Sequence, residues 1–273
     1  MTMNTVDELI VPRTIPALWA AKRQNQPIVM LTAYDASFAH QADLAGVDIL
    51  LVGDSLGMVI QGQRDTLSVT LDAMVYHTLA VRRGAPQRLI MADMPFLSEV
   101  TVDLAVQSAG RLMQEGGADL VKIEGGHAKA DIVRALTEAG IPVCAHVGLL
   151  PQRVRQLGGY RVQGRDAEDA ARILHDAETL TDAGAALVLV ECVPSPLGAR
   201  LADSLAVPVI GIGAGNAVDG QVLVLHDALG LNSHPPRFVR DFLRGRGSIG
   251  QALTAYAAAV RDRSFPADHE GYI

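Results

Sequence analysis

Eight short apolar runs recur along the chain, and this repetition constrains the fold more than any other feature. Several runs follow small residues such as Ala45-Gly46 or Ala139-Gly140, which is typical of a helix that ends just before a strand begins. Each run has the length of a β-strand. The eight runs are residues 28–33, 48–52, 88–92, 119–123, 141–145, 186–190, 207–212 and 222–226.

Segments with helical spacing lie between several of these runs. Leu71, Met74, Val75 and Leu79, for example, follow the potential capping residue Thr70. Because strands that are apolar along their whole length are covered by helices on both faces, the alternation predicts a parallel sheet. Eight such units predict an α/β fold, a (β/α)₈ TIM barrel, with an open doubly wound sheet as the alternative.

The length of 273 residues fits a single domain over residues 1–273, with a barrel core at about 28–230. Residues 4–23 are expected to add an N-terminal helix. Residues 235–263 are expected to add two C-terminal helices, which close the barrel floor or form a subunit interface.

The connections between the runs depart from a regular barrel in two ways. Residues 213–222 leave too little room for a crossover helix, so the seventh unit should be abbreviated. Residues 53–70 and 147–165 are long and rich in glycine, as is typical of binding loops. We expect both loops to lie over the active face of the barrel.

Composition argues against several classes of partner and location. Lys and Arg total 23 against 30 Asp and Glu, a net charge of −7, and no basic tract suggests nucleic-acid binding. Cys144 and Cys192 lie in apolar runs without metal-site spacing, which favours reduced thiols and a cytoplasmic location. The first residues do not resemble a signal peptide, and no apolar run approaches the roughly 18 residues of a membrane span.

Polar residues follow the runs where each predicted strand ends, and this edge builds the active site in barrel enzymes. Six of the eight strand ends carry a carboxylate. Such an acidic ring is costly unless a cation occupies it, and oxygen ligands suit Mg²⁺ or another hard divalent ion. The residues at these ends are Tyr34 and Asp35, Asp54 and Ser55, Asp93, Glu124, His146, Glu191 and Asp227.

Asp54 and Asp93 follow neighbouring strands in equivalent positions. Each taken alone is best explained as a cap of the next helix or turn, the usual role of Asp in such places. Taken together, they would lie close enough to share one cation, and we favour that interpretation.

Lys122 and Glu124 are two residues apart, so both side chains should point to the same face of their strand. One interpretation is a self-neutralising ion pair. The other is that Glu124 extends the metal site while Lys122 faces a substrate carboxylate or a developing enolate oxygen. The spacing alone leaves both open.

His146 and Glu191 end the fifth and sixth runs. A lone histidine in such a place is more often structural than catalytic. Glu191 ends a strongly apolar strand, and burial favours the neutral form of a carboxyl group, so it is a plausible general base. A salt bridge to an unidentified cation is its alternative role.

A glycine-rich loop, Gly211-Ile-Gly-Ala-Gly215, follows the seventh run. Barrel enzymes often bind phosphate at this place through backbone N–H groups. A tight turn without a ligand explains the pattern equally well.

With these positions in place, the chain resembles the ketopantoate hydroxymethyltransferase family. The resemblance extends over about residues 28–245 and rests on the combination of motifs rather than on any one of them. The motifs are TAYDASFA at 32–39, LVGDSLGM at 51–58, YHT at 76–78, RRGAP at 82–86, ADMPF at 92–96, VKIEGG at 121–126, GGYRVQG at 158–164, ECVP at 191–194 and IGIGAG at 210–215.

The resemblance implies a Mg²⁺-dependent barrel enzyme and a homodecameric assembly. It would transfer a hydroxymethyl group from 5,10-methylenetetrahydrofolate to 3-methyl-2-oxobutanoate, giving 2-dehydropantoate and tetrahydrofolate for pantothenate and coenzyme A biosynthesis. Asp54 and Asp93 resemble the metal ligands, with Glu124 completing the acidic set. Asp54, Ser55, Asp93 and Lys122 resemble the contacts to the keto acid, and Glu191 resembles the proton acceptor.

This chemistry agrees with the residues found above. A 2-oxo acid chelates a cation through its carboxylate and keto oxygens, and Mg²⁺ stabilises the enolate that forms when Glu191 removes the C3 proton. The nearest alternative is a Mg²⁺-dependent carbon–carbon lyase or mutase of the phosphoenolpyruvate or isocitrate lyase type, acting on a 2-oxo acid. A non-catalytic barrel that only binds a cation is a further alternative.

Overall fold

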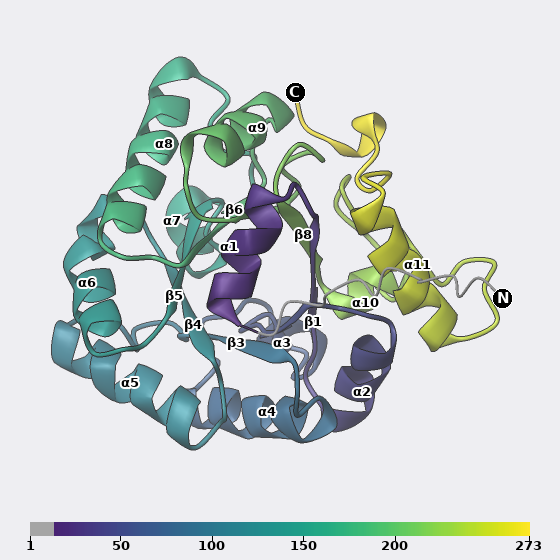
Figure 1. Ribbon diagram of the computed structural model, residues 1–273, viewed down its shortest axis with the longest axis horizontal. Coiled ribbons are helices and arrows are strands. Elements are labelled where there is room, and N and C mark those ends of the chain that lie inside the picture. Colours follow the sequence, from purple (N-terminus) through teal and green to yellow (C-terminus); the bar gives the residue numbers. More distant parts are fainter. Residues whose placement is uncertain (1–13) are drawn as a thin grey trace, which may run out of the picture.

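The computed structural model describes residues 14–273, which contain a closed barrel of eight parallel strands (Figure 1). Each strand pairs with the next in sequence, and β8 pairs with β1, so the predicted barrel is confirmed and the open sheet is excluded. The strands are β1 (Ile28–Thr32), β2 (Ile49–Val52), β3 (Leu89–Asp93), β4 (Leu120–Glu124), β5 (Val143–Gly148), β6 (Leu187–Glu191), β7 (Val209–Ile212) and β8 (Gly220–Leu223).

Helices that follow the first six strands form the outer layer of the barrel, and several begin at the predicted type of cap. Thr70, Thr101 and Asp166 each accept a hydrogen bond from a backbone N–H in the first turn. The apolar faces of these helices pack against the strands. The outer helices are α2 (Ala36–Leu44), α4 (Leu71–Gly84), α5 (Val102–Gln114), α6 (Ala130–Glu138), α8 (Ala167–Asp182) and α9 (Ser195–Ser204), with the 3₁₀ turn η1 (His127–Lys129) before α6.

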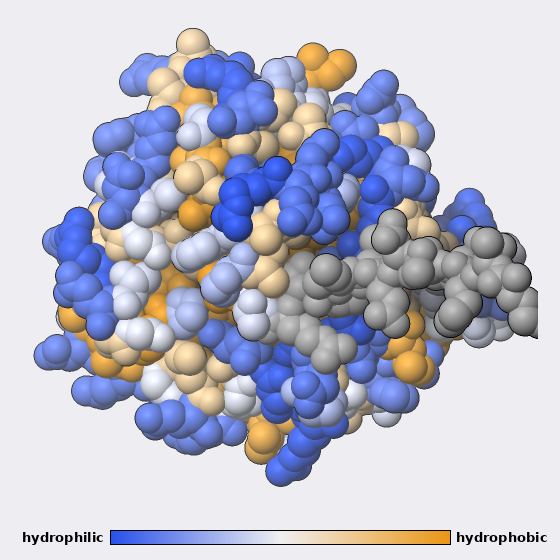
Figure 2. Space-filling model, in the orientation of Figure 1, coloured by the Kyte–Doolittle hydropathy of each residue, from blue (hydrophilic) through white to orange (hydrophobic). Residues whose placement is uncertain are grey.

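Helix α1 (Ile15–Arg23) covers the end of the barrel where the strands begin. Nε1 of Trp19 donates to the carbonyl of Ala186 at 2.9 Å, and Nζ of Lys22 lies 2.6 Å from Oδ2 of Asp219. Figure 2 shows this face as a mosaic of hydrophilic and hydrophobic side chains. The expected helix at 4–23 is therefore present from residue 15, while residues 4–13 lie outside the described part of the chain.

The prediction of two helices within residues 235–263 is wrong, because the structure has one, α11 (Ile249–Arg261). Residues 235–248 form turns that bury Phe238 and Phe242, and Pro235-Pro236 begins this segment. Helix α11 packs beside α2 and β1, where the Tyr256 hydroxyl donates to the carbonyl of Met30 at 2.7 Å. It thus occupies the outer-layer position after β8, where the chain itself has only the short α10 (Leu225–Ala228).

The seventh unit is abbreviated as predicted, since β7 runs into β8 with no helix between them. Strand β8, however, spans 220–223 rather than 222–226, and His226 and Asp227 lie in α10. A side chain at Gly220 would collide with the carbonyl of Ile28, so the glycine permits the close pairing of β8 with β1.

The two long loops lie at the ends of the strands where the site is expected. Residues 53–70 contain α3 (Leu56–Val59), and residues 147–165 contain η2 (Pro151–Arg153) and α7 (Val154–Leu157). The last residues, after η3 (Asp268–Glu270), return to this rim, where the backbone N–H of Ser195 donates to the carbonyl of Tyr272 at 2.9 Å. No helix within residues 14–273 is both long and apolar enough to cross a membrane.

Candidate active site

A cavity of about 650 Å³ opens at the carboxyl ends of the strands. The two long loops cover part of it, and Phe238 and Tyr272 from the C-terminal part of the chain form another wall. It brings together every site residue expected from the sequence, namely Asp54, Ser55, Asp93, Lys122, Glu124, His146 and Glu191, together with Asp227. Tyr34 and Asp35, at the end of the first strand, do not line it. The Asp35 carboxylate instead caps α2 by accepting from the N–H groups of Ser37 and Phe38.

Asp54 and Asp93 lie side by side and are each 3% exposed. The backbone N–H of Asp54 donates to Oδ2 of Asp93 at 2.9 Å, while Oδ1 of Asp93 is buried without a hydrogen bond. Burial raises the pKa of both carboxyl groups, and the charges of Asp93 and Glu124 raise that of Asp54 further. Neither side chain caps a helix, so simple helix capping does not explain the pair.

Lys122 is buried among these carboxylates. Its Nζ lies 3.2 Å from Oδ1 of Asp93 and 4.0 Å from Oε1 of Glu124. Burial lowers its pKa, but the carboxylates of Asp93, Glu124 and Asp54 outweigh this effect and raise it above the ordinary value. The ion pair of Lys122 with Glu124 that the spacing suggested is therefore present, and both residues line the cavity.

Gln152, at the start of the loop after β5, was not identified from the sequence. Its backbone N–H donates to Oε2 of Glu124 at 3.0 Å, and its side-chain amide donates to Oδ2 of Asp54 at 2.9 Å and to the carbonyl of Met94 at 3.0 Å. One residue of this loop thus holds two of the three carboxylates that surround Lys122. Glutamine is common in exposed loops, so its identity gave no signal of this role.

Three carboxylates around Lys122, which we call the acidic cluster, have the chemistry of a site for a hard cation. They are those of Asp54, Asp93 and Glu124. Oδ1 of Asp93 and Oε1 of Glu124 are buried oxygens without hydrogen bonds, although Nζ of Lys122 lies within 4.0 Å of each. Lys122 is outnumbered by the three carboxylates around it, since Asp54, Asp93 and Glu124 all act on its charge. Within residues 14–273, no three Asp, Glu, His or Cys side chains form a complete ligand cluster. A cation such as Mg²⁺ would accordingly bind one or two carboxylates and complete its shell with water or substrate oxygens. Direct ligation by Glu124 stays a prediction.

His146 lies between Lys122 and Glu191. Its Nδ1 is 3.1 Å from Nζ of Lys122, and its Nε2 is 3.3 Å from Oε2 of Glu191. Burial, followed by the nearby Lys122 charge, lowers the pKa of the imidazole. Because an ammonium group only donates hydrogen bonds, Nδ1 is the acceptor and the proton of the neutral ring is on Nε2, which faces Glu191.

Glu191 ends β6 at the wall of the cavity opposite the acidic cluster across His146. Its side chain is 16% exposed, so the burial expected from its apolar strand is incomplete. The carboxylate is therefore open to a substrate in the cavity while its backbone is held in the barrel.

The glycine-rich loop at the end of β7 and Tyr34 are two further features beside the cavity. The glycine loop is a tightly packed turn, because a side chain at Gly213 would lie 2.7 Å from Phe238 and one at Gly211 would lie 2.9 Å from Val218. No helix follows it, so packing rather than anion binding explains its glycines. Tyr34, which follows the first strand as predicted, lies beside the cavity, with its hydroxyl 2.9 Å from Oγ of the lining residue Ser55.

Similarity to known proteins identifies the family of this chain. Residues 12–268 match the family model described as ketopantoate hydroxymethyltransferase. The chain belongs to this family. A relative from Halorhodospira halophila, named 3-methyl-2-oxobutanoate hydroxymethyltransferase, is 52% identical over 95% of this chain and 94% of its own. One of the same name from Nitrosococcus oceani is 55% identical over 93% and 96%, respectively.

Membership of the ketopantoate hydroxymethyltransferase family makes this chain an enzyme of the transferase class. Solved structures of more distant proteins share its fold. Phosphoenolpyruvate phosphomutase from Streptomyces platensis is 16% identical, with a TM-score of 0.60 and coverage of 80% of this chain and 82% of that one. A complex of phosphonopyruvate hydrolase with oxalate and Mg²⁺ is 13% identical, with a TM-score of 0.61 and coverage of 92% and 96%.

Proposed function

We propose that this enzyme transfers a hydroxymethyl group from 5,10-methylenetetrahydrofolate to 3-methyl-2-oxobutanoate. The products are 2-dehydropantoate and tetrahydrofolate, in pantothenate and coenzyme A biosynthesis. The observation that carries the proposal is the chain of contacts Asp93–Lys122–His146–Glu191, which joins an acidic cluster to a carboxylate base within one cavity. The names of the relatives support the choice of substrate.

The acidic cluster suits the charged end of the keto acid. Asp54 and Asp93 would hold Mg²⁺, with Glu124 ligating it directly or through water, and the bound ion would act as a Lewis acid toward the keto oxygen. The ammonium group of Lys122 would face the negative oxygens of the substrate, and the Ser55 hydroxyl would donate to its carboxylate. The oxalate and Mg²⁺ bound by phosphonopyruvate hydrolase, a protein of the same fold, support the choice of cation.

Glu191 would act as the base. Its carboxylate accepts the proton from C3 of the keto acid and becomes neutral, and the electron pair left on the substrate is delocalised onto the keto oxygen. The C3 carbon then attacks the methylene carbon of the folate, the two bonds from that carbon to the folate nitrogens break, and water supplies the hydroxyl group of the product. The two nitrogens take up one proton from the neutral Glu191 and one from water, which gives tetrahydrofolate and restores the Glu191 carboxylate. Donation from Nε2 of His146 would orient Glu191 for the first step.

The lyase or mutase alternative has weaker support. Its enzymes share the barrel fold at 13–19% identity, which is evidence for architecture alone. Those lyases that use a cysteine acid need it on a mobile loop, whereas Cys144 lies in β5 and Cys192 directly follows β6, and both are buried.

Product analysis tests the proposal and separates it from the alternative. The protein should form 2-dehydropantoate from 3-methyl-2-oxobutanoate, methylenetetrahydrofolate and Mg²⁺, whereas a lyase or mutase forms none. Without folate, the protein in deuterated water should exchange the C3 hydrogen of the keto acid. Glu191→Gln should slow this exchange by roughly 10²–10⁴-fold, while the exposed Glu178→Gln on α8 serves as a control. Undiminished exchange in Glu191→Gln would show that the proposed base is wrong.

We further propose a cytoplasmic homodecamer. The two buried cysteines are unpaired, as expected in a reducing compartment.

The segment after β3 exposes several large apolar side chains, which supports burial in a subunit interface. They are Phe96, Leu97, Val100, Val102 and Leu104.

A further inference from the structure

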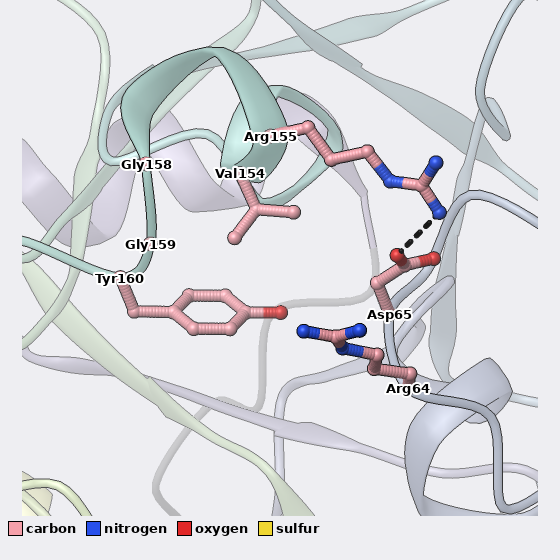
Figure 3. Close-up of a pocket in the computed structure, with 7 residues that line it drawn as sticks. All are labelled: Arg64, Asp65, Val154, Arg155, Gly158, Gly159 and Tyr160. Atoms are coloured by element: carbon pink, nitrogen blue, oxygen red, sulfur yellow. Dashed lines mark hydrogen bonds and ion pairs between the residues drawn. The ribbon is translucent and has the colours of Figure 1, made fainter.

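A groove of about 600 Å³ lies between the two long loops (Figure 3). We call it the loop groove. Arg64 and Asp65 from the first loop and Val154, Arg155 and Tyr160 from the second loop line it, together with Gly158 and Gly159. None of these seven residues has a role in the proton transfer proposed above.

The loop groove is cationic although the chain carries a net charge of −7. Residues 147–165 contain four exposed arginines and no acidic residue; of the four, Arg155 lines the groove and Arg161 lines the adjacent main cavity. In the first loop, Arg64 is exposed and forms no ion pair with the described residues, while Asp65 is only 15% exposed. Such a concentration of arginine favours an anionic ligand, because the guanidinium group binds carboxylates in a fixed geometry.

Asp65 holds one of the two groove arginines in position. Its Oδ2 lies 3.0 Å from a terminal nitrogen of Arg155, and this hydrogen bond lowers the pKa of the Asp65 carboxyl group. Figure 3 shows the guanidinium groups of Arg64 and Arg155 near Asp65, with the Tyr160 hydroxyl pointing toward Arg64. The remaining N–H groups of both arginines are therefore available to a ligand in the groove.

Tyr160 connects the loop groove to the active site, since this one side chain lines both the groove and the main cavity. The residue is 51% exposed, and its hydroxyl donates to the sulfur of Met58, which also lines the main cavity. A long ligand can therefore place one end beside Glu191 and extend its other end past Tyr160 into the groove.

We propose that the loop groove binds the carboxylates of the glutamate tail of the folate co-substrate through Arg64 and Arg155, with the Tyr160 ring packing against the tail. This inference rests on the proposed function, because it assigns a place to the part of the folate that does not react. The methylene carbon must reach C3 of the keto acid near Glu191. The negatively charged tail must leave the acidic cavity, and the cationic groove is adjacent to it.

Steady-state kinetics with two forms of the co-substrate test the inference. The probes are methylenetetrahydrofolate with one glutamate and with three. In the double variant Arg64→Gln/Arg155→Gln, the KM for the triglutamate should rise by at least about tenfold, since each charged hydrogen bond contributes on the order of tenfold. The kcat, the KM for the keto acid and folate-independent C3 exchange should not change. The exposed Arg134→Gln on α6 is the matched control.

The outcomes distinguish this inference from the proposed function. An unchanged KM for both folates in the double variant would overturn the tail site, while turnover by the unaltered protein would still support the transferase. An absence of product with the unaltered protein would contradict the proposed function instead. In that case calorimetric binding of triglutamyl tetrahydrofolate decides the inference, which is overturned if the unaltered protein and the double variant bind it equally or if neither binds it.

Discussion

Nε2 of His146 lies 3.3 Å from Oε2 of Glu191, and both side chains face the same cavity. The other ring nitrogen of His146 lies 3.1 Å from Nζ of Lys122. Contact with Lys122 makes Nδ1 the acceptor and leaves the proton on Nε2, the nitrogen nearer Glu191, although Nε2 forms no hydrogen bond in this geometry. A histidine interpreted from the sequence as mainly structural thus connects the acidic cluster to the proposed base.

His146→Gln should reduce C3 exchange by between about tenfold and a hundredfold, because Glu191 loses the partner that orients it. The KM for the keto acid should change little, since the acidic cluster and Lys122 remain. The measurement is the exchange rate in deuterated water across a range of pH. His175→Gln on the exposed side of α8 is the control, and equal rates in the two variants would contradict the positioning role.

The sequence was sufficient to predict the barrel and most of the site, because both depend on local patterns. Alternation along a strand placed Lys122 and Glu124 on one face, and equivalent positions after neighbouring strands placed Asp54 beside Asp93. The structure confirms that these side chains share one cavity.

The parts that the sequence did not reveal depend on contacts between distant segments. Gln152 reaches Asp54 across 98 positions of the sequence, and no local pattern marks such a pair. Strand β8 begins at Gly220-Gln221, which does not read as an apolar strand, and it is recognised only by its pairing with β1 and β7. The missing second C-terminal helix has a local cause, since Gly245, which has a φ of +76°, and Gly247 interrupt the segment before α11.

Asp54→Asn should stabilise the metal-free protein at neutral pH, by a few degrees in Tm at most. Folding raises the pKa of this carboxyl group through burial and nearby charges, so the ionised form is less favourable in the folded state than in the unfolded chain. Asparagine removes that charge. As the pH falls toward the raised pKa, the native carboxyl group binds a proton and the advantage of asparagine should shrink.

Thermal unfolding with a chelator between about pH 5 and pH 8 measures this difference. Added Mg²⁺ should raise the Tm of the unaltered protein and have much less effect on Asp54→Asn. A variant that is less stable by the same margin at every pH, and equally responsive to Mg²⁺, would remove the argument for a cation beside Asp54.

Gln152→Leu should loosen the loop after β5. The substitution removes the amide that donates to Asp54 and to the carbonyl of Met94, and it leaves a buried oxygen without a partner at a cost of about 1–3 kcal/mol. Trypsin should then cut after Arg153, Arg155 or Arg161 several times faster, as mass spectrometry of the fragments would show. Gln156→Leu on exposed α7 is the control, and similar cleavage of the two variants would show that Gln152 does not hold the loop.

Two glycine-to-alanine changes should have opposite effects on stability. A Cβ at Gly84, the last residue of α4, would collide with the carbonyl of Ala36, so Gly84→Ala should destabilise the protein by about 1–3 kcal/mol. Gly110 lies within α5 with open space around its Cβ position, so Gly110→Ala should stabilise it by about 0.5–1 kcal/mol. Denaturant unfolding compares the two, and equal signs would contradict this packing.

Leu97→Lys/Val100→Lys should weaken the assembly of subunits. These side chains are 56% and 54% exposed in the isolated chain and belong to the apolar segment after β3. Light scattering after size-exclusion chromatography should show a lower mass than for the unaltered protein, with unchanged helix content. Leu44→Lys, at an isolated exposed position on α2, should keep the original mass. Equal masses for all three proteins would place the interface elsewhere.

The position of Tyr272 has a practical consequence for experiments on this protein. The ring forms part of the cavity wall, and the next residue, Ile273, is 99% exposed. An affinity tag or a surface linker attached after Ile273 would start at the mouth of the cavity, where it can obstruct a long ligand. Attachment at an exposed residue of the outer helices, such as Glu178 on α8, leaves that entrance clear.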